Sequence, residues 1–160
     1  TLEDVFALQD TVANAVATRP GLFAAFVSIA GFHDALRSET GAAGPANVPE
    51  FGTVANEPGF RGLLAMSPYA KIELGTRYPA ALFTTGFNDQ RIDPWDPGKM
   101  AARLQEANRA PGGSGRPVLL RVDFAAGHGV TSTRDQAVAL YADVFAFLFW
   151  QLGNPAFEPK

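Results

Sequence analysis

The sequence predicts an α/β protein whose core is a parallel sheet of about three strands. Three segments are predicted to be strands: 22–31, 78–86 and 117–127. The first is a continuous apolar run, typical of a strand buried on both faces. Three other segments repeat apolar residues at helical spacing: 2–18, 94–110 and 131–153. The two kinds of segment alternate along the chain, which indicates parallel strands covered by helices.

The first helix and strand are delimited by local signals. Val5, Leu8, Val12 and Val16 would lie on one face of a helix, and the Arg-Pro-Gly stretch at 19–21 would end it. The run at 22–31 then closes on a glycine, as a buried strand commonly does at its exit.

Residues 38–70 separate this strand from the next. Residues 38–62, the first part of the segment, are rich in Gly, Pro, Ala and Asn, so we expect a long excursion with little regular structure. A short helix is predicted within 59–70, ending before Pro68 because proline disfavours helical backbone in the residue that precedes it.

The remaining elements follow in order over 78–153. Pro97 is tolerated in the predicted helix 94–110 because it falls in the first turn, where an amide N–H has no intrahelical partner. Residues 111–115 read as a surface turn. Ser132 or Thr133 is a candidate N-cap of the final helix, and Gly153 is its predicted stop.

Composition excludes several functional classes. The formal net charge of -3 gives no basic footprint, so we expect no nucleic-acid partner. The absence of cysteine excludes disulfides, thiol catalysis and thiolate metal sites. No apolar run is long enough to span a membrane, and the acidic residues 1–10 do not resemble a signal peptide. The sequence therefore suggests a soluble domain, and it indicates neither a cofactor nor a cellular compartment.

Two loops carry candidate chemistry, because ligands and catalytic groups of parallel sheets gather beyond the carboxyl ends of the strands. Asp89 follows the exit glycine of the second predicted strand, and His128 stands between two glycines after the third. A carboxylate followed by a histidine fits the last two members of a Ser-Asp-His triad in the α/β-hydrolase order.

Structural explanations of the same residues remain open. Asp89 could cap the turn that leads into the next helix, and His128 could be an ordinary loop residue. His33 is expected to be a cap or surface residue, and Asp93 and Asp96 to be charges that favour the helix dipole. Two distant histidines without clustered carboxylates do not predict a metal site.

The motifs in these loops carry a family resemblance. "YPAALFTTGFNDQRIDPWDPGKMAARLQ" and "PVLLRVDFAAGHG" resemble the C-terminal catalytic region of the prolyl oligopeptidase family of serine peptidases, and the resemblance covers roughly residues 12–152. It implies that residues 1–160 are the C-terminal portion of an α/β-hydrolase peptidase domain without a propeller domain. It also implies hydrolysis of oligopeptides through an acyl-enzyme.

The resemblance assigns roles to three residues. Asp89 and His128 match the family's catalytic aspartate and histidine. Arg91 matches an arginine that hydrogen-bonds a substrate carbonyl, and a structural salt bridge is the alternative role for its guanidinium.

The family's nucleophile is a serine in a G-x-S-x-G motif, and this sequence does not contain that motif. The chain has five serines, none in a G-x-S-x-G setting: Ser28, Ser38, Ser67, Ser114 and Ser132. We therefore expect a catalytic part that is inactive by itself. The alternatives are a non-catalytic α/β domain for partner binding or self-assembly, and an esterase with an unrecognised serine beside His128. An open sheet edge beside the first strand would favour a homodimer.

Overall fold

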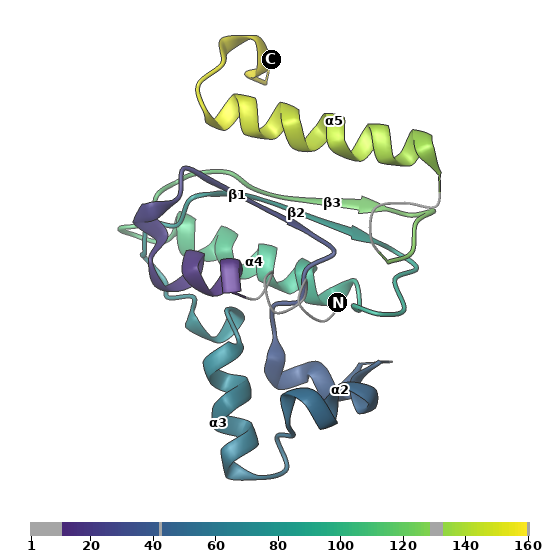
Figure 1. The fold of residues 1–160 in the computed structure, drawn as a ribbon. Coiled ribbons are helices and arrows are strands. Elements are labelled where there is room, and N and C mark those ends of the chain that lie inside the picture. The colour runs from purple at the N-terminus through teal and green to yellow at the C-terminus, as the bar shows by residue number, and fades with distance from the viewer. Residues whose placement is uncertain (1–10, 42, 129–132, 160) are drawn as a thin grey trace.

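The computed structural model describes residues 11–41, 43–128 and 133–159. Its sheet has three parallel strands in the order β1-β2-β3, with bounds Ala25–Ile29, Ala80–Gly86 and Val118–Asp123 (Figure 1). Every residue of β2 is buried, as expected for a strand flanked by two neighbours and covered on both faces. The predicted α/β class is confirmed.

Helices connect and cover the strands. Residues 11–18 are helical, which agrees with the described part of the helix predicted over 2–18. The α-helices that follow are α2 (Gly44–Phe51), α3 (Glu57–Met66), α4 (Trp95–Arg109) and α5 (Arg134–Gln151). Short 3₁₀ turns lie at Pro20–Leu22, Ala35–Thr40, Tyr69–Lys71 and Pro155–Phe157.

The sheet is the middle layer of the molecule, with one apolar core on each face. Figure 1 shows α5 on one face, and α4 together with the helical residues 11–18 on the other. Phe26, Phe83 and Met100 belong to the core on the α4 side, while Leu82 and Val144 belong to the core beneath α5. Successive β2 residues therefore feed opposite cores, as the period of two in a strand requires.

The expectation of little regular structure in the first part of 38–70 is wrong, because α2 and α3 lie there. Pro45 falls in the first turn of α2, where its missing N–H costs no hydrogen bond, and Gly52 follows the helix with a φ of 90°. The side chain of Asn56 caps α3 by accepting a hydrogen bond from the backbone N–H of Gly59 at 2.9 Å. The predicted end of this helix before Pro68 is correct.

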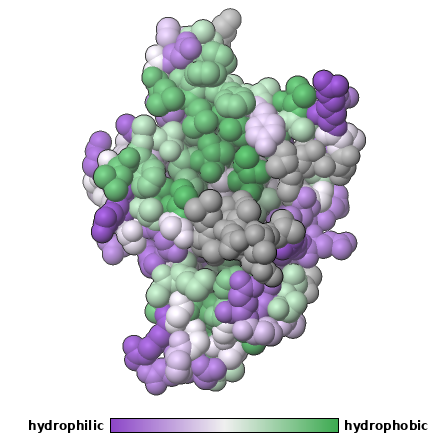
Figure 2. All heavy atoms as spheres, in the orientation of Figure 1, coloured by the Kyte–Doolittle hydropathy of each residue, from purple (hydrophilic) through white to green (hydrophobic). Residues whose placement is uncertain are grey.

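The outer face of α5 remains apolar. Its exposed large side chains are Val138, Tyr141, Phe145 and Phe149. Hydrophobic residues also gather in Figure 2 over the upper part of the molecule, where Figure 1 places α5 and the sheet. None of the helices in the described ranges is long and apolar enough to cross a membrane.

Candidate active site

The loops after β2 and β3 bring Asp89 and His128 into contact. The Nδ1 atom of His128 lies 2.9 Å from Oδ2 of Asp89. Gly86, at the end of β2, makes this approach possible, because a Cβ there would lie 2.1 Å from the carbonyl oxygen of Gly127. Backbone hydrogen bonds fasten the loops together, including one of 3.1 Å from the N–H of Asn88 to the carbonyl of Ala126.

Both carboxylate oxygens of Asp89 are engaged. Oδ1 accepts the backbone N–H groups of Arg91 at 2.8 Å and Ile92 at 2.9 Å, while Oδ2 faces His128. The turn-capping role and the histidine contact, which the sequence leaves as alternatives, therefore coexist in one side chain. Burial by itself raises the pKa of Asp89, but the hydrogen bonds from His128, Ile92 and Arg91 outweigh it, and the pKa lies below its ordinary value.

The two partners differ in their access to solvent. The side chain of Asp89 is 0% exposed and that of His128 is 29% exposed. A buried carboxylate that accepts Nδ1–H holds a neutral imidazole in the tautomer whose lone pair is on Nε2. The arrangement can therefore supply a proton acceptor on a partly exposed side chain.

Arg91 lines a cavity of about 220 Å³. The cavity lies between the excursion after β1 and residues 91–96, which lead into α4 and are called the α4 entrance below. Its apolar lining includes Phe32, Phe51, Ile92 and Trp95. Sequence reasoning missed this cavity, because half of its wall comes from the segment expected to be irregular.

His33 does not have the role expected of it. It was expected at a cap or on the surface, but it is 1% exposed and its Nδ1 lies 2.9 Å from Oδ1 of Asp96. Asp96 stands in the first turn of α4 as predicted, yet it is also buried, at 1% exposed. The contact joins residues 63 positions apart, so no local sequence signal points to it.

Four of the five serines lie in the described ranges, each in a different setting. Ser28 pairs with His33 at 3.0 Å, and Ser67 donates to the carbonyl of His33 at 3.3 Å. Ser38 lines the cavity, and Ser114 donates to the carbonyl of Tyr78 at 2.7 Å. Ser132, together with the glycine that follows His128, lies outside the described residues.

Comparison with known proteins identifies the family of this chain. The model of the prolyl oligopeptidase family matches residues 11–155, nearly the whole chain. The chain belongs to the prolyl oligopeptidase family. Among curated relatives, dipeptidyl aminopeptidase BI of Pseudoxanthomonas mexicana is 35% identical over 104 residues, covering 65% of this chain and 14% of the relative. Prolyl endopeptidase of Elizabethkingia meningoseptica is 29% identical over 136 residues, covering 84% and 19%.

Solved structures of the prolyl oligopeptidase family share the fold. A prolyl endopeptidase structure matches with a TM-score of 0.82 at 33% identity, covering 90% of this chain and 21% of that one. Prolyl oligopeptidase B from Galerina marginata, solved with a 35mer substrate, gives 0.80 at 28% identity and covers 91% and 20%. The predicted partial α/β-hydrolase fold is thereby confirmed, and the chain spans about a fifth of the length of these proteins.

The described residues offer no evident metal centre. They contain no group of three or more histidine, cysteine or carboxylate side chains placed to hold an ion.

Proposed function

We propose that this chain carries the acid–base part of a serine peptidase that hydrolyses oligopeptides. The observation that carries the proposal is the 2.9 Å contact between His128 Nδ1 and Asp89 Oδ2 at neighbouring strand ends. Membership of the prolyl oligopeptidase family supplies the reaction class, acyl transfer from a peptide bond to a nucleophile and then to water.

Each residue would have a distinct role. The Nε2 atom of His128 would accept the proton of the nucleophile and later return it to the leaving amine. The Asp89 carboxylate would stabilise the imidazolium that forms in between. Arg91 would donate to a substrate carbonyl beside the cavity that its side chain lines, a task suited to a permanently charged group with several fixed donors.

We propose further that these 160 residues do not hydrolyse peptides by themselves. None of the five serines stands in a G-x-S-x-G motif, and the four that the structure describes have the settings given above. Loss of the serine removes covalent catalysis, and loss of the elbow's backbone N–H removes an oxyanion donor worth about 10²–10³ in rate.

The second candidate is a non-catalytic α/β domain that binds a partner. In such a domain, the loops after β2 and β3 would have no reason to hold a carboxylate beside a histidine. The buried carboxylate of Asp89 and its contact with His128 favour the peptidase reading.

An affinity label tests the proposal without needing the nucleophile. An N-blocked dipeptidyl chloromethyl ketone ending in proline carries an electrophilic methylene where the scissile bond would lie. We expect the Nε2 lone pair of His128 to attack that carbon, releasing chloride and leaving an alkylated imidazolium. Peptide mapping by mass spectrometry should place the label on His128 and leave the buried His33 unmodified.

Matched variants separate chemistry from binding. D89N should lower the maximal alkylation rate at least about tenfold, because the amide no longer secures the tautomer. H128Q should abolish labelling, and E106Q, at an exposed position of α4, should behave as the wild type. Absence of labelling in the wild type, or equal rates in D89N, would contradict the proposed role.

A further inference from the structure

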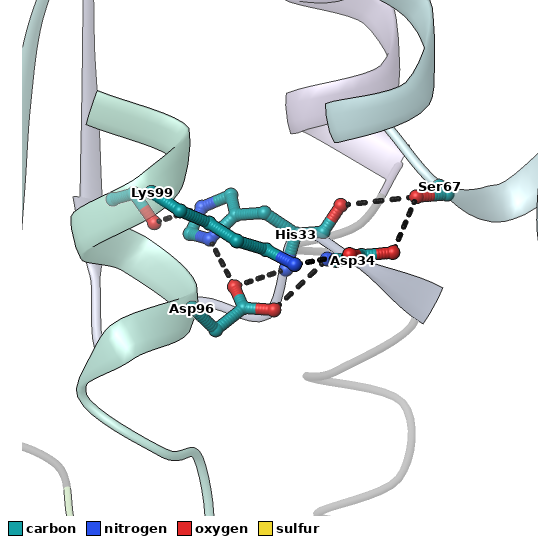
Figure 3. A network of polar contacts seen from close by, with 6 residues as sticks. His33, Asp34, Ser67, Asp96 and Lys99 are labelled. Carbon is teal, nitrogen blue, oxygen red and sulfur yellow. Dashed lines mark hydrogen bonds and ion pairs between the residues drawn. The ribbon is translucent and has the colours of Figure 1, made fainter. Parts of the chain in front are cut away.

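A second set of hydrogen-bonded side chains is buried between β1 and α4 (Figure 3). Ser28 Oγ lies 3.0 Å from His33 Nε2, and His33 Nδ1 lies 2.9 Å from Asp96 Oδ1. His33 and Asp96 are each 1% exposed. The proposed peptidase chemistry uses none of these residues.

The atoms follow the order of a catalytic triad, but Ser28 is badly placed for a nucleophile. It is 8% exposed and lies within β1, on the face that packs toward α4. The backbone of Gly31 closes over it, since a Cβ on that glycine would lie 2.1 Å from Ser28 Oγ. Neither Ser28 nor His33 lines the cavity beside Arg91, so a substrate carbonyl has no described route to the hydroxyl.

The network instead joins separate segments of the chain. The Asp96 carboxylate accepts the backbone N–H groups of His33 at 2.8 Å and Asp34 at 3.0 Å. Asp34 forms an ion pair with Lys99 of α4 and accepts a hydrogen bond from Ser67 at 3.4 Å. Figure 3 shows the five labelled side chains converging from the β1 exit, from the residue after α3 and from the start of α4.

These three segments are also walls of the cavity beside Arg91. Its lining takes Phe32 and Ala35 from the β1 exit, Leu63 and Met66 from α3, and Asp93 and Trp95 from the α4 entrance. The contact is direct at one wall, because the Lys99 ammonium lies 4.6 Å from the centroid of the Trp95 ring. A shift of the network would therefore move the cavity walls relative to one another.

We propose that His33 and Asp96 are positioning residues that fix this cavity in the shape that receives a substrate side chain. The proposal rests on the proposed peptidase function. His33 can do this because its two ring nitrogens hold β1 and α4 at once. Removing the ring leaves Ser28 and the buried Asp96 with fewer partners, and the α4 entrance can then relax away from the β1 exit.

Kinetics of the same affinity label test the positioning role. The inactivation constant KI reports how well the peptide occupies the cavity, whereas the maximal rate kinact reports the chemistry of His128. H33L removes both ring hydrogen bonds, and we expect it to raise KI about tenfold while kinact stays within about twofold. H33N can place its amide N–H₂ near the position of Nδ1 and should recover most of the lost affinity.

V144A is the matched control, because it removes buried volume from the core beneath α5, remote from the network. It should lower the free energy of unfolding without changing KI. A KI for H33L equal to that of the wild type, or a V144A effect as large as that of H33L, would overturn the positioning role.

A second readout keeps the test decisive if the wild type resists labelling, which would overturn the proposed function instead. The chain has two tryptophans, and Trp95 lines the cavity. In an NMR spectrum, the indole N–H resonance of Trp95 should shift in H33L and keep its position in V144A. An unmoved resonance in H33L would refute the coupling between network and cavity wall whatever the function of the site.

Discussion

One oxygen of the Asp89 carboxylate accepts backbone hydrogen bonds from the following turn, and the other contacts the imidazole of His128. The backbone hydrogen bonds fix the direction of the carboxylate. The carboxylate then fixes the orientation of the His128 ring. A single buried side chain thus links the backbone of the β2–α4 loop to the position of an accessible histidine. Replacing it should affect both the loop and the imidazole.

The lowered pKa of Asp89 predicts how stability depends on pH. The unfolded chain binds a proton near the ordinary value of 3.8, whereas the folded protein binds it only at lower pH. The stabilisation is therefore present above about pH 4 and is lost as the pH falls through the folded pKa. In urea titrations between pH 6 and pH 2.5, the wild type should lose more unfolding free energy than D89N.

E106Q serves as the comparison, because Glu106 is exposed on α4. Its pH profile should follow that of the wild type. If D89N and the wild type lost stability in parallel, the ionised form of Asp89 would have no preferential stabilisation in the folded protein.

Sequence reasoning located Asp89 and His128 but not the partners of His33. The first two follow strand ends, and strand ends of a parallel sheet meet at one edge. The contact between His33 and Asp96 joins residues 63 positions apart through the packing of α4. No local pattern around His33 indicates that packing, so the sequence favoured a surface position.

At the scale of elements, α5 begins at the residue where the sequence offers a cap. Thr133 is the N-cap, and its hydroxyl accepts the backbone N–H of Gln136 at 3.2 Å. In the excursion, composition was misleading, because Gly and Pro stand at helix ends and first turns and also inside helices, as Pro49 does in α2 and Gly62 in α3. Composition averaged over the segment could not distinguish helix boundaries from irregular chain.

T133A should lower the free energy of unfolding by about 1 kcal/mol, because the first turn of α5 loses its side-chain acceptor. T133S keeps the hydroxyl and should stay within about 0.5 kcal/mol of the wild type. Urea denaturation followed by circular dichroism measures both. Equal stabilities of the alanine and serine variants would show that the cap contributes nothing.

At the scale of the whole molecule, the parallel pairing of the three strands follows from the alternation of strand and helix. Alternation cannot show which residues complete a cavity, since that depends on how α2 and α3 fold back toward the α4 entrance. The sequence likewise could not distinguish the exposed apolar side chains of α5 from the buried ones, because apolar residues occur on every side of that helix.

Fluorophosphonate labelling of the purified 160-residue chain, read by intact mass, tests the central claim most directly. If Asp89 and His128 are the acid–base part of a triad whose nucleophile is none of the chain's five serines, the mass should be unmodified. Ser28 in particular should stay unlabelled despite its contact with His33. A stoichiometric adduct, mapped to any serine, would contradict this claim and show that the chain holds an activated nucleophile of its own.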